Sequence, residues 1–211
     1  HAYVVLQTSA LRSISIADPA DLVQVGQVNF PSFSNSVFVV GSLAYVTLHN
    51  NARLVVVDVS DPSDPDELGF VSFAGDGAQD VVVAGSIAYV ATAAGLRVVD
   101  VGDPTDPTEL GFLTSSGTGY GVDLDGTTVY RAGDSMLEAI DVSTPGAPAL
   151  LDTWDLFDWG RSVTVQGGHA LVAAQDAGLT LIDVTKPKMP AEVGGMTCLL
   201  YTSDAADELL G

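Results

Sequence analysis

The sequence predicts an all-β protein that is built from tandem units of about 42 residues, each with four short strands. Three observations support this prediction. Two sequence patterns recur in step, the apolar residues come in short β-branched runs, and Gly, Pro, Asp and Ser bound those runs. The chain has 211 residues and is 47% hydrophobic, which provides enough apolar material for a core.

The first recurring pattern is a strand that ends in Asp and continues into a proline-containing turn. It occurs four times, as LVVVDVSDPSDP from Leu54, LRVVDVGDPTDP from Leu96, MLEAIDVSTPGAP from Met136 and LTLIDVTKPKMP from Leu179. A second pattern, AYV or a variant of it, begins at Ala2, Ala44, Ala88, Val129 and Ala170. Because two independent patterns keep the same spacing, the chain is a tandem repeat.

Each unit divides into four strand-sized pieces, which the copy that begins at Ala78 illustrates. AQDVVVAG leads through a two-residue turn at Gly85-Ser86 into IAYVATA, and such a glycine turn is typical of a β-hairpin. LRVVDVG ends at Asp-Pro-Thr-Asp-Pro, where proline lacks the amide that would continue a ladder, and TELGFLT follows as the last strand. Four antiparallel strands repeated at this spacing are typical of β-propeller blades.

This division sets the expected blade boundaries. We expect an incomplete blade without its inner strand at 1–30, followed by complete blades at 34–73, 78–114, 119–154 and 160–196. No strand that would close the ring is visible at either end. The predicted fold is therefore a partial β-propeller of about five blades, with the sequence cut at both ends.

The last residues, 198–211, abandon the repeat. Within them, CLLYTSDAADE at 198–208 resembles a translated sequencing adapter and includes Cys198, the only cysteine of the chain. We therefore expect this tail to be non-native. Without it, the repeats hold no cysteine for a disulfide, a thiol nucleophile or a thiolate metal site.

The third-strand motifs LVVVDVSDPSDP, LRVVDVGDPTDP and LTLIDVTKPKMP, with the ELG that follows and the AYV strand, resemble the LVIVD repeat family. The resemblance covers nearly all of residues 2–197. It implies a propeller fold and an exported or cell-surface protein of bacterial or archaeal origin. It implies no catalytic residues, because the family has no agreed active site.

Charge narrows the classes of partner. The net charge is −20, and an acidic surface repels phosphate backbones, so we expect no nucleic acid partner. No apolar run is long enough to span a bilayer as a helix, so we expect no membrane insertion in this part of the protein.

The recurring aspartates are expected to be structural. They end the third strand of successive blades, at Asp58, Asp100, Asp141 and Asp183. An Asp side chain in this position can accept hydrogen bonds from the backbone amides of the adjoining turn. Calcium needs about six to eight oxygens at one point, whereas these carboxylates are spread around the ring. We therefore expect no metal and no cofactor.

The predicted binding surface is the face formed by the outer-to-inner and the second-to-third strand loops, because propellers usually bind along such a rim or at the channel mouth. The candidate ligand-binding residues are polar, charged or aromatic and comprise Asn35, His49, Asp80, Tyr120, Asp158, Trp159, Arg161 and Asp176. Equivalent positions at the start of the inner strands hold Asn35, then Gln79 or Asp80, then Tyr120 and Arg161. Asp76 is expected on the same face.

One loop, TWDLFDWGR at 153–161, concentrates aromatic and charged side chains, which suits a sugar or a protein partner. The alternative is that at least one of Trp154 and Phe157 covers the apolar gap between neighbouring blades.

Three functions remain open from the sequence. The favoured one is a non-enzymatic scaffold that binds protein or glycan, because no nucleophile elbow, HExxH or phosphate-binding loop is present. The second is a glycosidase-like propeller hydrolase whose catalytic carboxylates lie partly in missing blades. The third is a structural spacer in a longer surface protein.

Overall fold

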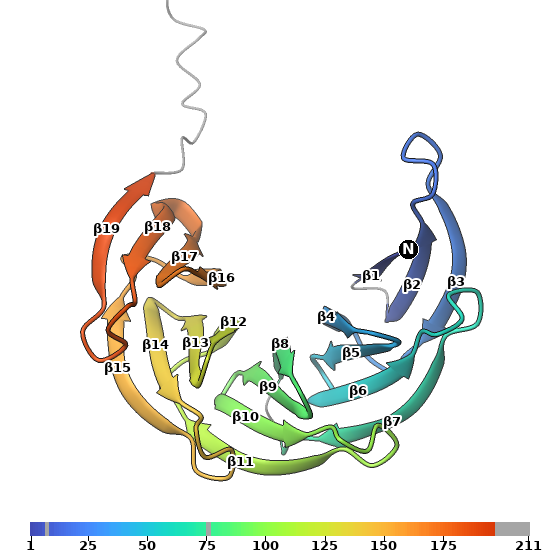
Figure 1. Cartoon of the computed structure of the whole chain (residues 1–211), viewed down its shortest axis with the longest axis horizontal. Coiled ribbons are helices and arrows are strands. Elements are labelled where there is room, and N and C mark those ends of the chain that lie inside the picture. Colours follow the sequence, from blue (N-terminus) through green and yellow to red (C-terminus); the bar gives the residue numbers. More distant parts are fainter. Residues whose placement is uncertain (7–8, 75–76, 197–211) are drawn as a thin grey trace, which may run out of the picture.

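Five antiparallel sheets stand side by side around a common centre and form an open arc (Figure 1). The computed structural model describes residues 1–6, 9–74 and 77–196. Each sheet is one blade, so the predicted all-β propeller fold is confirmed. The predicted tail at 198–211 and Asp76 lie outside the described residues.

The first blade has three strands and each of the other four has four. Blade 1 comprises β1 (Ala2–Leu6), β2 (Ala10–Ser15) and β3 (Val23–Asn29). Blade 2 comprises β4 (Ser34–Val40), β5 (Leu43–Leu48), β6 (Arg53–Asp58) and β7 (Asp66–Ser72). Blade 3 comprises β8 (Ala78–Ala84), β9 (Ile87–Thr92), β10 (Gly95–Asp100) and β11 (Thr108–Thr114).

The last two blades follow the same order. Blade 4 comprises β12 (Gly119–Asp125), β13 (Thr128–Gly133), β14 (Met136–Asp141) and β15 (Ala149–Asp155). Blade 5 comprises β16 (Gly160–Gln166), β17 (His169–Ala174), β18 (Gly178–Asp183) and β19 (Ala191–Met196), with a short 3-10 helix, η1 (Gln175–Ala177), between β17 and β18. Within each of these four-stranded blades the chain runs outward from the inner strand, and the inner strands β4, β8, β12 and β16 face the centre (Figure 1).

The core lies between the blades rather than inside one. Four apolar clusters each join two successive sheets; one of them packs Leu54 and Val56 of blade 2 against Val81 and Val90 of blade 3. The second strands of blades 2 and 3, β5 and β9, are buried on both faces, which explains why they read as nearly continuous apolar runs instead of an alternating pattern. Burial of this surface is the main attraction that holds neighbouring blades together.

Every blade carries the same β-bulge between its third and its outer strand. In blade 3, Val98 pairs with Gly111 and Val99 with Glu109, so that Leu110 is the extra residue. The residue after the bulge is a glycine in four blades, namely Gly26, Gly69, Gly111 and Gly194. Blade 4 has Asp152 in this position.

The glycine after the bulge makes room for the proline turn of the next blade. A Cβ on Gly69 would lie 2.5 Å from the carbonyl oxygen of Thr105, and a Cβ on Gly111 would lie 2.6 Å from that of Pro145. Gly26 is confined in the same way by Pro62. The glycine of the ELG motif is therefore required by a contact with the following repeat.

The aspartates that end the third strands shape those same turns. Each accepts a hydrogen bond on Oδ1 from a backbone amide two residues later: Ser60 for Asp58, Gly102 for Asp100, Ser143 for Asp141 and Thr185 for Asp183, at 2.8–2.9 Å. The bonds from Ser60 and Ser143 hold the pKa of Asp58 and of Asp141 below the ordinary value. These hydrogen bonds thus fix the shape of the turn that lies against the bulge of the preceding blade.

Substitution of the bulge glycine tests the contact between the bulge and the proline turn of the next blade. Gly111→Ala is expected to lower the free energy of unfolding by about 1–3 kcal/mol, because the added Cβ overlaps the Pro145 carbonyl oxygen. Gly194→Ala is the matched control, since no described atom lies within 4 Å of its Cβ position. Urea denaturation measures both variants, and equal stability of the two would contradict the tight contact.

Candidate functional site

Several of the predicted binding residues meet at a pocket of about 430 Å³ on the face where the inner strands begin, which we call the rim face. The pocket lies over blades 2, 3 and 4, and its lining consists of Asn35, His49, Gln79, Ala93, Thr118 and Tyr120. The structure therefore brings together Asn35 and His49 of blade 2 with Tyr120 of blade 4.

A chain of hydrogen bonds holds the polar side of this pocket. Asn35 Nδ2 donates to Gln79 Oε1 at 2.9 Å and to the Ala78 carbonyl oxygen at 3.1 Å. Gln79 Nε2 lies 3.0 Å from His49 Nδ1. Because the Gln79 amide nitrogen can only donate, Nδ1 of His49 is assigned as the acceptor and Nε2 carries the proton. An N–H donor is thus available on the imidazole at the pocket.

An aromatic stack continues the rim face toward blade 5. The rings of Tyr120 and Trp159 lie 6.3 Å apart between centroids, with 23° between their planes. The Arg161 guanidinium lies over both rings, 4.6 Å and 5.0 Å from their centroids, and its Nη2 donates to Gln175 Oε1 at 3.0 Å. Trp159 remains 44% exposed, so part of the stack faces solvent.

Asp158 fixes the loop that presents this stack. Its Oδ1 accepts a hydrogen bond from the Trp159 amide at 2.7 Å, and its Oδ2 accepts one from the Asp176 amide at 2.8 Å. These bonds, first that from Trp159, hold the pKa of Asp158 below the ordinary value. Asp158 and Asp176 therefore join the β15–β16 loop to η1, and ligand binding by them stays a prediction.

The other two aromatic residues of this loop occupy different environments. Trp154 packs against the apolar cluster between blades 4 and 5, next to residues such as Leu156 and Val163. Phe157 is 90% exposed. Trp154 therefore covers the gap between the blades, whereas Phe157 projects from the surface.

Asp80 lies deeper in the channel than the pocket residues and connects three blades. Its Oδ1 accepts hydrogen bonds from Ser36 Oγ at 2.6 Å and from the Val81 amide at 2.9 Å, while its Oδ2 accepts one from the Val122 amide at 3.0 Å. Burial is the main cause of its raised pKa. Gln79 is the residue equivalent to Asn35 and Tyr120, as the strand registers show. Ligand binding by Asp80 stays a prediction.

Asp123 makes the same kind of connection one blade further on, and sequence analysis missed it. Its Oδ2 accepts a hydrogen bond from the Val165 amide at 2.6 Å, and its Oδ1 accepts one from the Leu124 amide at 2.8 Å. Within the described residues, no group of three or more His, Cys, Asp or Glu side chains is placed to hold a metal ion. The Asp80 and Asp123 carboxylates are thus engaged with the backbone of neighbouring blades.

A buried ion pair beneath the rim face also escaped the sequence analysis. Arg131 and Glu138 are only 2% and 4% exposed, and their Nη1 and Oε2 atoms lie 2.6 Å apart. Arg131 Nη2 also donates to the carbonyl oxygens of Thr92 and Gly117, so it holds the loop that carries the pocket residue Thr118. In blade 2 the equivalent cross-strand pair is valine with valine, Val46 and Val55.

The LVIVD repeat model matches residues 33–72, 74–114 and 160–197. With the blades and the rim face described above, the molecule is a repeat-built β-propeller. The chain belongs to the LVIVD repeat family. No curated protein matches it in sequence.

Solved structures share the fold at low sequence identity. The chain resembles BamB from Moraxella catarrhalis (TM-score 0.64, 17% identity, 87% of this chain and 55% of that one). It also resembles the Swd1 β-propeller domain from Myceliophteria thermophila (TM-score 0.69, 11% identity, 92% of this chain and 69% of that one). A third similar structure is a putative 6-phosphogluconolactonase from Bacteroides fragilis (TM-score 0.73, 14% identity, 88% of this chain and 64% of that one). The chain thus spans between about half and two thirds of these structures, and such identities show the fold alone.

Removal of the Asp80 charge tests the connection between blades. Asp80→Asn is expected to lower the free energy of unfolding at pH 7 by about 1–3 kcal/mol, because the amide nitrogen cannot accept one of the bonds that the carboxylate accepts. Asp155→Asn, in an exposed position, is the control.

The pH dependence of this difference has a defined sign. Because the pKa of Asp80 is raised in the folded protein, the folded state binds the proton more tightly than the unfolded state does. The stability that Asp80 adds, relative to Asn, should therefore fall as the pH rises from the ordinary Asp pKa through the raised value. Urea denaturation between pH 3 and 8, roughly, measures it, and a difference that grows over this range would contradict the assignment.

The buried ion pair gives a separate test. Glu138→Val alone is expected to cost about 3–5 kcal/mol of unfolding free energy, because it leaves the Arg131 charge buried without its partner. The double variant Arg131→Val with Glu138→Val recreates the valine pair of blade 2 and should recover most of this loss. Thermal and urea unfolding measure both; a double variant less stable than the single one would refute this.

Proposed function

We propose that this protein is a non-enzymatic scaffold that binds a neutral glycan on its rim face. The observation that carries the proposal is the Tyr120–Trp159–Arg161 stack, with Trp159 partly exposed, next to a pocket lined by amide and imidazole groups. Aromatic faces accept the apolar face of a sugar ring, and amide and imidazole groups exchange hydrogen bonds with its hydroxyls. A protein partner is the alternative occupant of this face.

The electrostatics of the chain favour a neutral glycan over an acidic one. The net charge of −20 repels polyanions, and Arg161, which faces the stack, is already engaged by two rings and by Gln175. The hydrogen bonds of the Asn35–Gln79–His49 chain hold its polar groups in place before a ligand arrives. Such preorganisation reduces the conformational entropy that binding costs.

The arrangement of the channel carboxylates supports a binding role over hydrolysis. Glycoside hydrolysis generally needs two carboxyl groups that flank one bond. Asp80 and Asp123 instead accept backbone amide bonds from neighbouring blades. The name of the putative 6-phosphogluconolactonase belongs to that protein and, at 14% identity, carries no activity over to this chain.

An exported or cell-surface location completes the proposal. It rests on the resemblance of the repeats to a family typical of such proteins. Among the described residues, the structure contains no helix that is long and apolar enough to cross a membrane.

Glycan binding and its dependence on Trp159 test the proposal. The wild-type protein is expected to bind neutral glycans on an array, and Trp159→Ala should weaken that binding by up to about tenfold, since the ring supplies the stacking surface. Phe157→Ala is the matched control, because this residue lies in the same loop, outside the stack, and should bind like wild type.

Three results would reject a non-enzymatic glycan-binding role for this site. They are an array without hits for the wild-type protein, equal losses in the two variants, or hydrolysis of an arrayed glycan. Binding of a protein partner that depends on Trp159, without any glycan binding, would assign the rim face to protein recognition instead.

A further inference from the structure

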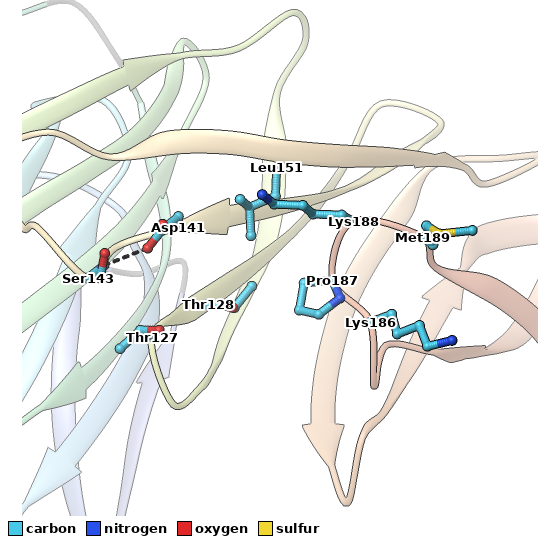
Figure 2. A pocket seen from close by; sticks show the side chains of 9 residues that line it. All are labelled: Thr127, Thr128, Asp141, Ser143, Leu151, Lys186, Pro187, Lys188 and Met189. Carbon is cyan, nitrogen blue, oxygen red and sulfur yellow. Dashed lines mark hydrogen bonds between the residues drawn. The ribbon is translucent and has the colours of Figure 1, made fainter.

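A second pocket, of about 500 Å³, lies between blades 4 and 5 on the face opposite the rim (Figure 2). The two pockets lie at opposite ends of β12. Tyr120, near the start of this strand, lines the rim pocket, and Thr128, just after the hairpin that follows the strand, lines the second pocket. The opposite wall is the turn after β18, residues 186–189. The volume is within the range of ligand pockets in proteins, about 300–1,000 Å³.

The pocket occurs where the repeat departs from its own rule. At the three preceding interfaces a glycine after the bulge lies against the proline turn of the next blade. Blade 4 has Asp152 there, directly after Leu151, and Leu151 and Pro187 line opposite sides of the pocket (Figure 2). The pocket therefore lies at the one of these four interfaces whose bulge residue is not a glycine.

The lining carries opposite charges and an apolar surface. Lys186 and Lys188 are the only lysines of the sequence, and both are in this turn. Lys188 extends across the pocket toward Leu151 and Asp141, whereas Lys186 points away (Figure 2). Within the described part of the chain, neither lysine has an ion-pair partner within 4 Å.

Asp141 supplies the opposite charge. The Ser143 amide donates to its Oδ1 at 2.9 Å, and Oδ2 is left to accept from a ligand. Besides the Ser143 bonds, the positive charge of Lys188 lowers the pKa of Asp141, which agrees with the two groups facing the same space. The side chains of Leu151, Pro187 and Met189 provide the apolar part of the lining.

We infer that this pocket binds a small zwitterion with an apolar group, as in a free α-amino acid such as leucine. The carboxylate of the ligand pairs with Lys188, its ammonium pairs with Asp141, and its side chain lies against Leu151 and Met189. A simple anion is repelled by the net charge of −20, and a simple cation pairs with Asp141 but leaves the charge of Lys188 without a partner. A zwitterion has no net charge and satisfies both groups.

Three ligands of the same shape separate these possibilities in isothermal titration calorimetry with the wild-type protein. L-leucine carries both charges, 4-methylpentanoate only the carboxylate, and 3-methylbutylamine only the ammonium. Leucine is expected to bind, and each analogue should bind at least about tenfold more weakly, because it loses one charge-assisted hydrogen bond. Absence of leucine binding, or equal affinity of either analogue, would overturn the inference.

Variants of the turn locate the site. Lys188→Gln and Asp141→Asn should each weaken leucine binding by about tenfold, and the asparagine can still accept the Ser143 bond. Lys186→Gln is the matched control on the same turn and should bind leucine like wild type. Equal losses in the Lys186 and Lys188 variants would indicate general charge attraction and reject the site. Lys188 is in a surface turn, so its variant keeps the test valid if Asp141→Asn unfolds.

The two proposed sites are independent. The leucine pocket shares no residue with the rim face, so Trp159→Ala should leave leucine binding unchanged, and Lys188→Gln should leave glycan binding unchanged. Loss of leucine binding in Trp159→Ala would contradict the separate location.

Discussion

The contact of the proline turns of blades 2, 3 and 4 with the bulge glycines of the preceding blades is the constraint on which the rest of the structure depends. Apolar burial attracts neighbouring sheets but does not choose one position for them, because it is non-directional. The close approach of Gly69 to Thr105, and of Gly111 to Pro145, does choose one. Polar links then reinforce it, such as the hydrogen bond from the Tyr130 hydroxyl to the Val184 carbonyl oxygen. Burial of that hydroxyl, and secondarily the charge of Asp125, raise the pKa of Tyr130 to about 12.

Because these contacts and the apolar burial hold neighbouring blades together, single residues can differ from the repeat without loss of the fold. The departures gather in blade 4 and at its junction with blade 5. On the rim face Tyr120 meets Trp159 and Arg161, beneath it Arg131 and Glu138 replace a valine pair, and on the opposite face Asp152 replaces glycine. Both candidate sites include positions where the sequence differs from the repeat, and the positions that follow the repeat form the blades that hold these residues.

The sequence was sufficient for the fold because the blade signals are local: strand periodicity, glycine hairpins and proline turns all lie within one repeat. The sites depend on contacts between repeats, which one sequence does not display. The roles of Asp80 and Asp123 are hidden because their partner amides belong to other blades. Arg131 was visible as a charge in an apolar position. The replacement of the repeat's glycine by Asp152 was visible as well. Why the other blades have glycine there could be seen only in the structure, where the glycine contacts the turn of the next blade.

A crystal structure of the Asp152→Gly variant tests this account most directly. If the glycine is what seats the next blade, the turn at residues 186–189 should move onto β15, with Pro187 in the place that Pro145 has beside Gly111, and the pocket of about 500 Å³ should close. A turn that stays in its present position, with the pocket still open, would contradict the claim that this one contact sets the spacing of the blades.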